Sequence, residues 1–266
     1  MKPWKRRLIV AMMLFVLLIP LVPLVIWSFS WRWDFPSLLP EFSTWAWGEV
    51  GSKKILKAIS VSLPVSLSVV AISLVLSFMP AKLLALENSK GKPFIEFLLL
   101  IPTFIPQISI IFGIQTVFRG IGIYSTLLGV VIAQLVFHVP YMTLLLTSVF
   151  KAYAPEYEQQ AACLGVNRWK TLIHVTLPAI RPGLMVTCVF SFVGSWGNYL
   201  IAAVIGPTKM QTLPVLLFPM MSSGNNSYPL IAAITILYIA PVLLFLILSS
   251  KVIIGEGFDP RRKSVI

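Results

Sequence analysis

Six long apolar runs, almost free of charge, constrain this chain more than any other feature. They cover approximately residues 8–29, 58–81, 94–118, 127–150, 182–205 and 229–250. A helix needs about 20 apolar residues to cross the hydrocarbon core of a bilayer. Each run is long enough, so the sequence predicts an all-α, polytopic membrane protein with about six transmembrane helices.

The composition agrees with a membrane protein. Of the 266 residues, 58% are hydrophobic and 11% are charged, whereas soluble domains have about 25% charged residues. A net charge of +12 would suggest nucleic-acid binding in a soluble protein. Here the basic residues lie at the edges of the apolar runs, where they can meet anionic headgroups. We therefore expect the lipid bilayer, and no nucleic acid, as their partner.

The basic residues are divided unequally between the two sides of the predicted spans. With the N-terminus inside, 15 of the 21 are inside: Lys2, Lys5, Arg6, Arg7, Lys82, Lys90, Lys92, Lys151, Arg168, Lys170, Arg181, Lys251, Arg261, Arg262 and Lys263. The other six are Arg32, Lys53, Lys54, Lys57, Arg119 and Lys209. By the positive-inside rule, both termini are predicted to lie in the cytoplasm of a bacterial plasma (inner) membrane. Four tryptophans between residues 31 and 47 would form an aromatic belt outside.

Ionisable residues within the runs are few. Glu96 is the third residue of the third run, and His138 lies in the fourth. Ion-driven transporters usually depend on intramembrane ionisable groups, so the scarcity of such groups argues against ion-driven transport. We interpret His138 as a structural histidine. Cys163 and Cys188 lack the spacing of a metal site, so no metal is expected. An ATP-independent secondary transporter or channel remains the main alternative function.

The segment from residue 151 to residue 183 differs from the other inside loops. Pro155 suits the first position of a helix, and Glu156 and Glu158 favour the positive end of its dipole. Gly165 can adopt the left-handed conformation that ends a helix. The pattern predicts a short helix of two to three turns.

A second short helix is predicted directly after the first. Asn167 can cap it, and it would cover residues 168–174. Leu177 and Pro178 would end it, because the residue before a proline disfavours the helical conformation. Two short helices on the inner side of a membrane protein make a projection that a soluble partner could bind.

The spacing within this loop resembles the EAA motif of the permease subunits of bacterial ABC importers. That motif consists of EAA, three residues, Gly, nine residues, Ile, one residue and LeuPro. The positions that reproduce the spacing are Ala161, Gly165, Val175, Leu177 and Pro178. Gln159 and Gln160 stand where the family usually has Glu and Ala, and Glu158 matches an acidic residue often found one position earlier.

The resemblance extends over roughly residues 55–250. It includes AlaIleSerValSerLeuPro from Ala58, LeuLeuIleProThrPheIlePro from Leu99 and SerTrpGlyAsnTyrLeu from Ser195. The family's type I (MetI-like) permease fold is implied. Residues 1–54 would hold the first transmembrane helix and an outer Trp-rich loop, 55–252 a core of five helices, and 253–266 a basic tail. Within the family, the sequence looks nearest to the polyamine, iron, thiamine and phosphonate branch.

The resemblance implies a transport subunit and not an enzyme. No GxxxxGK[ST] phosphate-binding loop is present, so ATP would be used by separate ATPase subunits, and the chain itself would bind no cofactor. A second permease and an extracytoplasmic binding protein would complete the importer. The residues expected to couple to the ATPase are Glu158, Gln159, Ala161, Gly165, Leu177 and Pro178. Candidates for the solute path are Gln107, Gln134, Trp196, Asn198 and Tyr199, together with Gln115 and Ser195.

Overall fold

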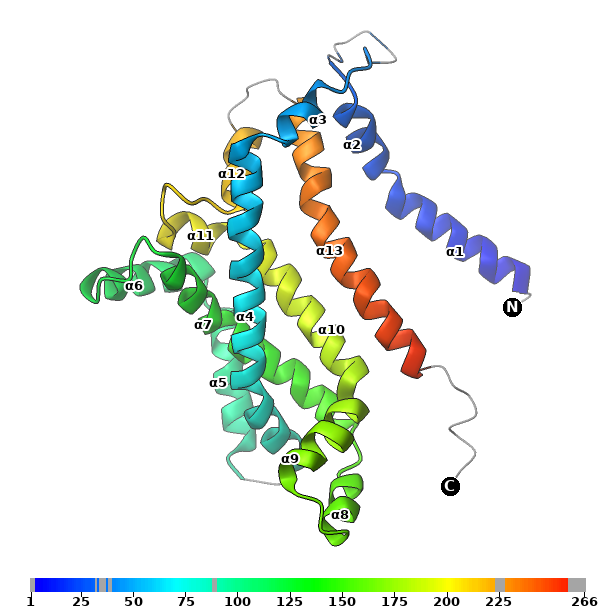
Figure 1. Ribbon diagram of the computed structural model, residues 1–266, viewed down its shortest axis with the longest axis vertical. Coiled ribbons are helices and arrows are strands. Elements are labelled where there is room, and N and C mark those ends of the chain that lie inside the picture. Colours follow the sequence, from blue (N-terminus) through cyan, green and yellow to red (C-terminus); the bar gives the residue numbers. More distant parts are fainter. Residues whose placement is uncertain are drawn as a thin grey trace.

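The computed structural model describes residues 3–31, 33, 37, 40–87, 90–222 and 228–257. Within these residues the regular structure is helical, apart from an isolated antiparallel bridge between Ser30 and Phe42. Four long helices form the bundle: α4 (Lys53–Leu86), α7 (Leu127–Lys151), α10 (Leu177–Trp196) and α13 (Tyr228–Gly257). α4 packs along α7 and α10, and α10 packs against α13 (Figure 1). The predicted all-α class is confirmed.

Small residues on α4 explain its close packing against α7. Ser62, Ser66, Ser73 and Ser77 are all buried on one side of α4, and small side chains let helix backbones approach closely in a membrane. The Ser77 hydroxyl donates a hydrogen bond of 3.0 Å to the carbonyl oxygen of Val139 in α7. α4 and α7 continue through their internal prolines, Pro64 and Pro140.

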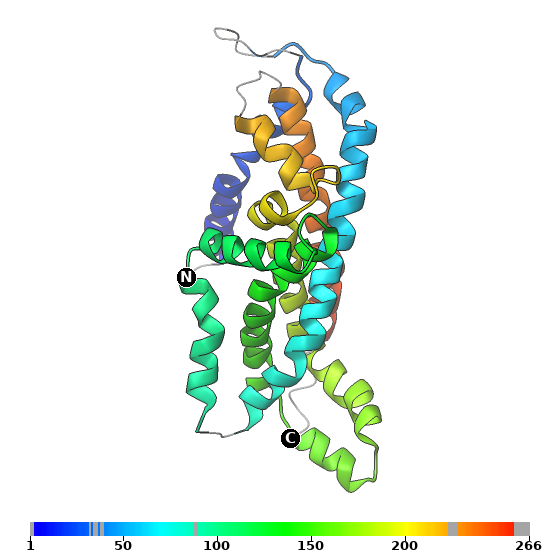
Figure 2. The ribbon, with the colours of Figure 1, turned by 90° about the vertical axis from the view of Figure 1, so that its left-hand side faces the viewer.

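The predicted number of spans needs adjustment. Among the described residues, four helices are long and apolar enough to cross a membrane, or five if one bent pair counts as a span. That pair is α5 (Lys92–Phe104) and α6 (Gln107–Gly120), which meet at 94°. Figure 2 shows α5 parallel to the bundle and α6 lying across it. The apolar run predicted over 94–118 is therefore divided into two helices, because Pro106 disfavours the helical conformation at Ile105, which is extended.

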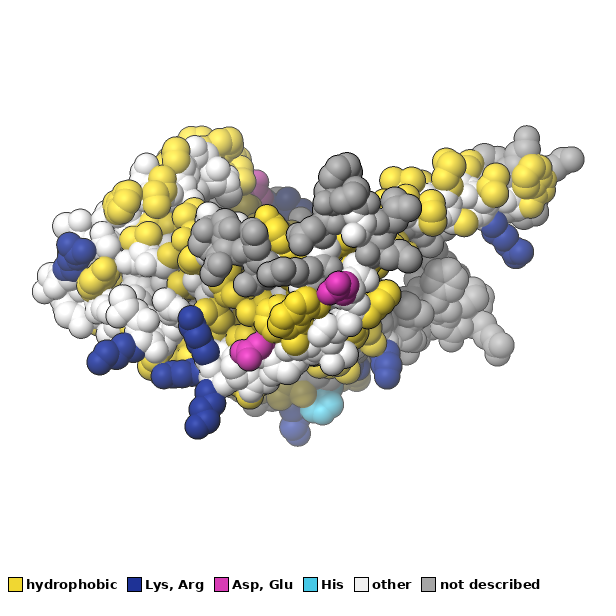
Figure 3. Space-filling model, turned by 90° about the horizontal axis from the view of Figure 1, so that it is seen from above, with side chains coloured by type: hydrophobic (Ala, Val, Ile, Leu, Met, Phe, Trp, Pro, Cys, Tyr) yellow, Lys and Arg dark blue, Asp and Glu magenta, His cyan; other side chains and the backbone are white. Residues whose placement is uncertain are grey.

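The first apolar run is also divided. α1 (Pro3–Leu18) and α2 (Leu21–Ser28) are separate helices, and Pro20 precedes α2. α2 packs against α13, whereas α1 projects from the bundle with hydrophobic side chains exposed along it (Figure 3). Neither helix alone reaches the length of a membrane span.

The fifth run begins earlier than predicted and ends earlier. α9 (Arg168–Thr171) leads through a π-helical turn, η1 (Leu172–Thr176), directly into α10, so that one helix covers Arg168–Trp196. Leu177 and Pro178 do not end a helix, because the wider π turn accommodates the hydrogen bonding that the proline disturbs. Gly197 and Asn198 then separate α10 from α11 (Tyr199–Ile205).

The helices α3 (Trp45–Val50) and α12 (Leu213–Ser222) lie at one end of the bundle (Figure 1). Aromatic residues gather at this end. The ring centroids of Trp31 and Trp45 are 5.5 Å apart, and those of Trp27 and Trp33 are 5.3 Å apart. We call this end the α3 end. The other, where α4, α7 and α13 finish, is the α8 end, after α8 (Glu156–Cys163) (Figure 1).

Some sequence predictions fall on residues outside the described part of the chain. They are Lys2, Arg32, Arg261, Arg262 and Lys263 of the charge distribution, and residues 258–266 of the predicted basic tail. They therefore stay predictions.

Candidate functional site: the α8 loop and a polar cluster in the bundle

The α8 loop, residues 152–176, has the local structure that its sequence predicts. α8 begins after Pro155, and Gly165 has a φ of +74°. The Asn167 side chain accepts a hydrogen bond of 3.2 Å from the backbone N–H of Trp169. A Cβ atom at Gly165 would have no atom within 4 Å. Glycine is therefore favoured there by backbone conformation and not by lack of space.

The outer surface of the loop carries large apolar side chains. Leu164 is 82% exposed and Trp169 is 72% exposed, and Tyr157 and Ile173 are also exposed. Gln159, beside them on α8, is exposed as well. Apolar side chains that gather on a loop beyond the bundle mark a surface suited to a protein partner.

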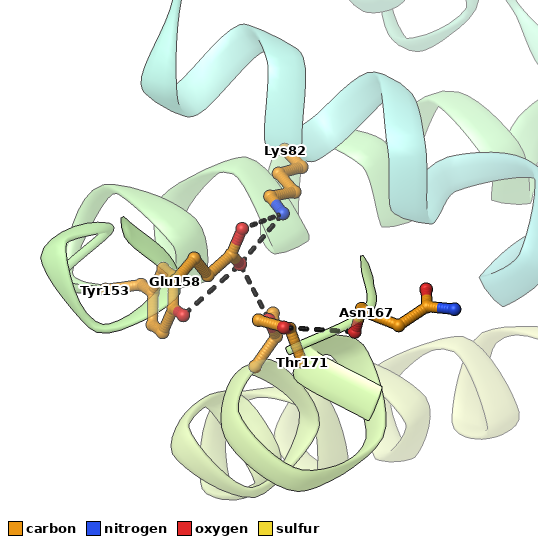
Figure 4. A network of polar contacts seen from close by, with 6 residues as sticks. Lys82, Tyr153, Glu158, Asn167 and Thr171 are labelled. Atoms are coloured by element: carbon orange, nitrogen blue, oxygen red, sulfur yellow. Dashed lines mark hydrogen bonds and ion pairs between the residues drawn. The ribbon is translucent and has the colours of Figure 1, made fainter. Parts of the chain in front are cut away.

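Glu158 points inward, toward the bundle, and not toward this outer surface. Its carboxylate accepts hydrogen bonds from Lys82 Nζ at 2.6 and 2.8 Å and from the Thr176 hydroxyl at 2.6 Å. The Tyr153 hydroxyl is a third donor, at 3.2 Å (Figure 4). Partial burial raises the pKa of Glu158, but Lys82 and Thr176 together lower it by more, so that this pKa lies below its ordinary value.

The other residues predicted for ATPase coupling differ in exposure. Ala161 is buried on the inner face of α8, where its small side chain permits close packing. Leu177 is half-buried, and Pro178 is exposed in the first turn of α10. Glu158 and Ala161 therefore face the bundle, whereas Gln159 is exposed.

A groove of about 750 Å³ separates α8 from the end of α4. Phe78, Met79 and Lys82 form its α4 side, and Ala162, Trp169 and Leu172 lie among the residues opposite. The lining is mostly apolar, and the Lys82–Glu158 ion pair lies in its wall.

A second polar site, the polar cluster around Gln134 and Ser195, lies in the middle of the bundle. The Ser195 hydroxyl of α10 donates a hydrogen bond of 2.6 Å to Gln134 Oε1 of α7. A cavity of about 10 Å³ adjoins them, a space on the scale of one water molecule. Its lining consists of Ser62, Val65, Ser66, Gln134, Ser195, Trp196, Asn198 and Thr212.

Four candidates for the solute path therefore lie together: Gln134, Ser195, Trp196 and Asn198. Asn198 also caps α11, because its side chain accepts the Ile201 N–H at 3.0 Å. Trp196 donates from Nε1 to the carbonyl oxygen of Tyr238 at 3.0 Å.

The remaining candidates lie apart from this cavity. Tyr199 stacks on Phe218 with centroids 4.6 Å apart, and Gln107 begins α6. Gln115 donates to the carbonyl oxygen of Val204 at 3.2 Å. His138 makes a hydrogen bond of 2.9 Å to the backbone carbonyl oxygen of Gln134, as a structural histidine does.

Sequence reasoning missed three polar residues of the cavity, Ser62, Ser66 and Thr212. The two serines lie four residues apart in the second apolar run, so helical spacing was a usable signal for them. Thr212 lies in an irregular segment before α12, where no periodicity points to it.

Known proteins similar to this chain are transport permeases. The trehalose transport system permease protein SugB of Mycobacterium tuberculosis is 26% identical over 197 residues, 73% of this chain and 72% of that protein. The sulfoquinovosyl glycerol transport system permease protein SmoH of Agrobacterium fabrum is 25% identical over 196 residues, 73% and 69% of the two chains. The names of these relatives refer to sugars and not to the polyamine, iron, thiamine and phosphonate branch that we expected.

The fold is found in solved importers. A chain of a bacterial ABC transporter involved in the import of the acidic polysaccharide alginate superposes with a TM-score of 0.72. The superposition covers 93% of this chain and 94% of that one, at 16% identity. A chain of the MetNI methionine ABC transporter gives 0.64, with 77% and 98% covered at 15% identity. The expected type I, MetI-like permease fold is confirmed.

Residues 74–262 match the family described as binding-protein-dependent transport system inner membrane component. The match spans the end of α4, the α8 loop and the helices that enclose the polar cluster. This chain belongs to that family, and it is a multi-pass membrane permease subunit of an ABC importer, a transport subunit and not an enzyme.

Proposed function

We propose that this permease passes the movement of a separate ATPase into the bundle through the α8 loop. The observation that carries the proposal is the exposure of the apolar side chains of Leu164 and Trp169 on the α8 loop, which projects beyond the bundle (Figure 1). An ATPase groove that receives α8 would cover this surface. The spacing of Ala161, Gly165, Leu177 and Pro178 supports its assignment as the EAA loop.

The α8 end would then face the cytoplasm. Basic residues gather there in the described part of the chain: Lys82, Lys90, Lys92, Lys151, Arg168 and Lys170. The positive-inside rule favours the cytoplasm for this end. Both termini follow it to the same side, and the α3 end faces outward with its tryptophans at the membrane interface.

The solute is proposed to be an uncharged carbohydrate or glycoside. The cavity in the bundle is lined by hydroxyl and amide side chains, one indole and Val65, without a charged residue among them. Hydroxyl and amide groups can exchange hydrogen bonds with a sugar, whereas a polyamine or a ferric ion would favour carboxylates. The names of the sugar-related relatives support a carbohydrate or glycoside, and trehalose among them is uncharged.

Three further components would complete the importer. A second permease would supply the other half of the path, ATPase subunits would bind the α8 loops, and an extracytoplasmic binding protein would dock at the α3 end. One solved alginate transporter similar to this chain is in complex with a periplasmic protein that carries an alginate pentasaccharide. ATP is used by the ATPase, and the chain itself binds no cofactor.

Uptake into proteoliposomes tests this function. The complete transporter, purified with its ATPase, second permease and binding protein, should accumulate solute with ATP and not with a non-hydrolysable analogue. Radiolabelled trehalose and diacetylchitobiose are the first probes, with spermidine and thiamine as comparisons. ATP-dependent accumulation of a sugar supports the proposal. Equal uptake without ATP contradicts it, and uptake of spermidine or thiamine alone contradicts the proposed solute class.

A matched pair of variants tests the docking surface. Leu164→Asp places a charge in the exposed apolar surface and should reduce binding of the ATPase. Phe42→Asp introduces a comparable change at an exposed apolar residue outside the long helices and should leave ATPase binding unchanged. Co-purification of the ATPase with the tagged permease measures both.

A further inference from the structure

The Glu158 carboxylate joins four parts of the chain at one point. Lys82 comes from the last turns of α4, Tyr153 follows α7, and Thr176 ends η1. All three donate hydrogen bonds to Glu158 of α8 (Figure 4). All of these hydrogen bonds are charge-assisted, the stronger kind, because the acceptor is an ionised carboxylate, and in the two from Lys82 the donor is charged as well.

The π turn helps to bring Thr176 into this position. A π-helix closes hydrogen bonds between residues five apart, so such residues lie near one face. Thr171 and Thr176 are five apart, and both are buried. In an unbroken α-helix, side chains five positions apart point to different sides, and the two threonines could not both face α8 and α4.

Apolar packing does not join α8 to α4 where the groove lies between them. The groove of about 750 Å³ has Phe78 and Met79 on the α4 side and Ala162 on the α8 side. α8 itself packs on α9 and η1. The ion pair between Lys82 and Glu158 therefore spans a gap that side-chain packing leaves open.

A second ion pair at the same end of the molecule provides a comparison. Lys151 Nζ of α7 lies 3.6 Å from Glu96 Oε1 of α5, and the exposed fractions of these side chains are 51% and 31%. The Lys82 and Glu158 side chains approach to 2.6 Å and are each 24% exposed. Shorter distance, lower exposure and two further donors all favour the Lys82–Glu158 pair, because exposed ion pairs are weakened by water and salt.

We propose that Lys82 and Glu158 form a tie that transmits movement of α8 to α4, with Glu158 as a positioning residue. When the ATPase displaces α8, the tie carries α4 with it, and α4 packs along α7 and α10 at the polar cluster. This inference rests on the proposed function and adds a route inside the permease.

The test compares the two ion pairs in the complete transporter. Lys82→Ala, Glu158→Ala and Glu158→Gln remove the tie, Lys82→Glu with Glu158→Lys reverses its charges, and Lys151→Ala and Glu96→Ala are the matched controls. The quantity measured is sugar accumulated per ATP hydrolysed, with trehalose or whichever sugar of the panel above the wild type accumulates. Glu158→Gln keeps the size of the side chain, so the test stands even if Glu158→Ala fails to assemble.

We expect the three single variants of the tie to transport about two- to thirtyfold less sugar per ATP, the range for disrupted coupling. The charge reversal should recover part of this loss, and the controls should keep the wild-type ratio. A purely structural role would lower the amount of transporter without changing the ratio. Wild-type ratios in Glu158→Gln and Lys82→Ala would overturn the tie alone. Absence of ATP-driven uptake in the wild type would overturn the proposed function, and the tie with it.

Discussion

The two polar regions of this permease are built differently. At the α8 end, a charged pair, Lys82 and Glu158, lies beside an open groove and is partly exposed. In the middle of the bundle, the neutral pair Gln134 and Ser195 is buried among close-packed helices, beside a space on the scale of one water molecule.

This difference follows from the surroundings of each region. A charge at the α8 end is partly exposed to water beside the open groove, so a charged pair can be held there at little cost. A charge in the middle of the membrane would have no such exposure and is expensive there. We infer that the middle is specified by packing and neutral hydrogen bonds, and the α8 end by charge.

The largest expected effect breaks the close packing of α10 against α7, near the end of α7. A Cβ atom at Gly183 of α10 would lie 2.6 and 2.7 Å from the two γ-carbons of Val149 in α7. Gly183→Ala should therefore destabilise the bundle by about 1–3 kcal/mol, as overpacking does. Thermal unfolding in detergent measures this effect. Val149→Ala in the same chain should restore most of the stability, and a Gly183→Ala variant as stable as the wild type would contradict the packing.

The next effect concerns backbone conformation at the α8 end. Gly165→Ala meets no neighbouring atom, but at a φ of +74° it should cost about 1–2 kcal/mol locally. We expect weaker ATPase binding with little change in the unfolding temperature of the bundle. Gly113→Ala in α6, where φ is ordinary and space is also open, is the control. Unchanged uptake in Gly165→Ala and in the bulkier Gly165→Val would remove the turn from the coupling mechanism.

A smaller effect sharpens the account of the neutral pair. Gln134→Leu and Ser195→Ala each remove one partner of a buried hydrogen bond. A double-mutant cycle on unfolding free energies should give a coupling of about 0.6 kcal/mol, the average for hydrogen bonds between membrane helices. A coupling indistinguishable from zero would show that packing alone specifies the middle.

The smallest effect is a pH dependence confined to the α8 end. Because the pKa of Glu158 is lowered in the folded protein, its contribution to stability is present above the ordinary carboxylate pKa. It is lost as the pH falls through the lower folded-state value. The unfolding temperature of the wild type should exceed that of Glu158→Gln by about 2 °C at pH 7, and the gap should close on acidification below the ordinary carboxylate pKa. Glu156→Gln, which leaves these contacts intact, is the control, and a gap that widened in acid would contradict the prediction.

Much of the fold and of the α8 loop could be predicted from the sequence, because both depend on local signals. Apolar runs near 20 residues indicated the long helices, and Pro155, Gly165 and Asn167 indicated the ends of α8 and the cap of α9. The sharpness of the bend before Pro106 and the π turn before Pro178 could not be predicted from proline alone. A proline inside an apolar run can be accommodated, as at Pro64, or can break the helix.

Local sequence signals could not predict the partner of Glu158 either. Lys82 lies 76 residues away in the chain, and the expectation for Glu158 was a contact with the ATPase. The cavity residues Gln134, Ser195 and Asn198 were proposed for their polarity, whereas Gln107 and Tyr199 have the same polarity and lie elsewhere. Residue type alone does not say which polar side chains converge.

A distance measurement tests the central claim, that α8 and α4 move together, most directly. Cys163 is a natural exposed cysteine at the end of α8, Cys188 is buried, and Leu83 is an exposed residue at the end of α4. Spin labels at Cys163 and Leu83→Cys, in the complete transporter, should keep one distance whether ATP is absent or trapped with vanadate. In Glu158→Gln the distance should change with nucleotide. A nucleotide-dependent distance in the chain with Glu158 intact would contradict the account.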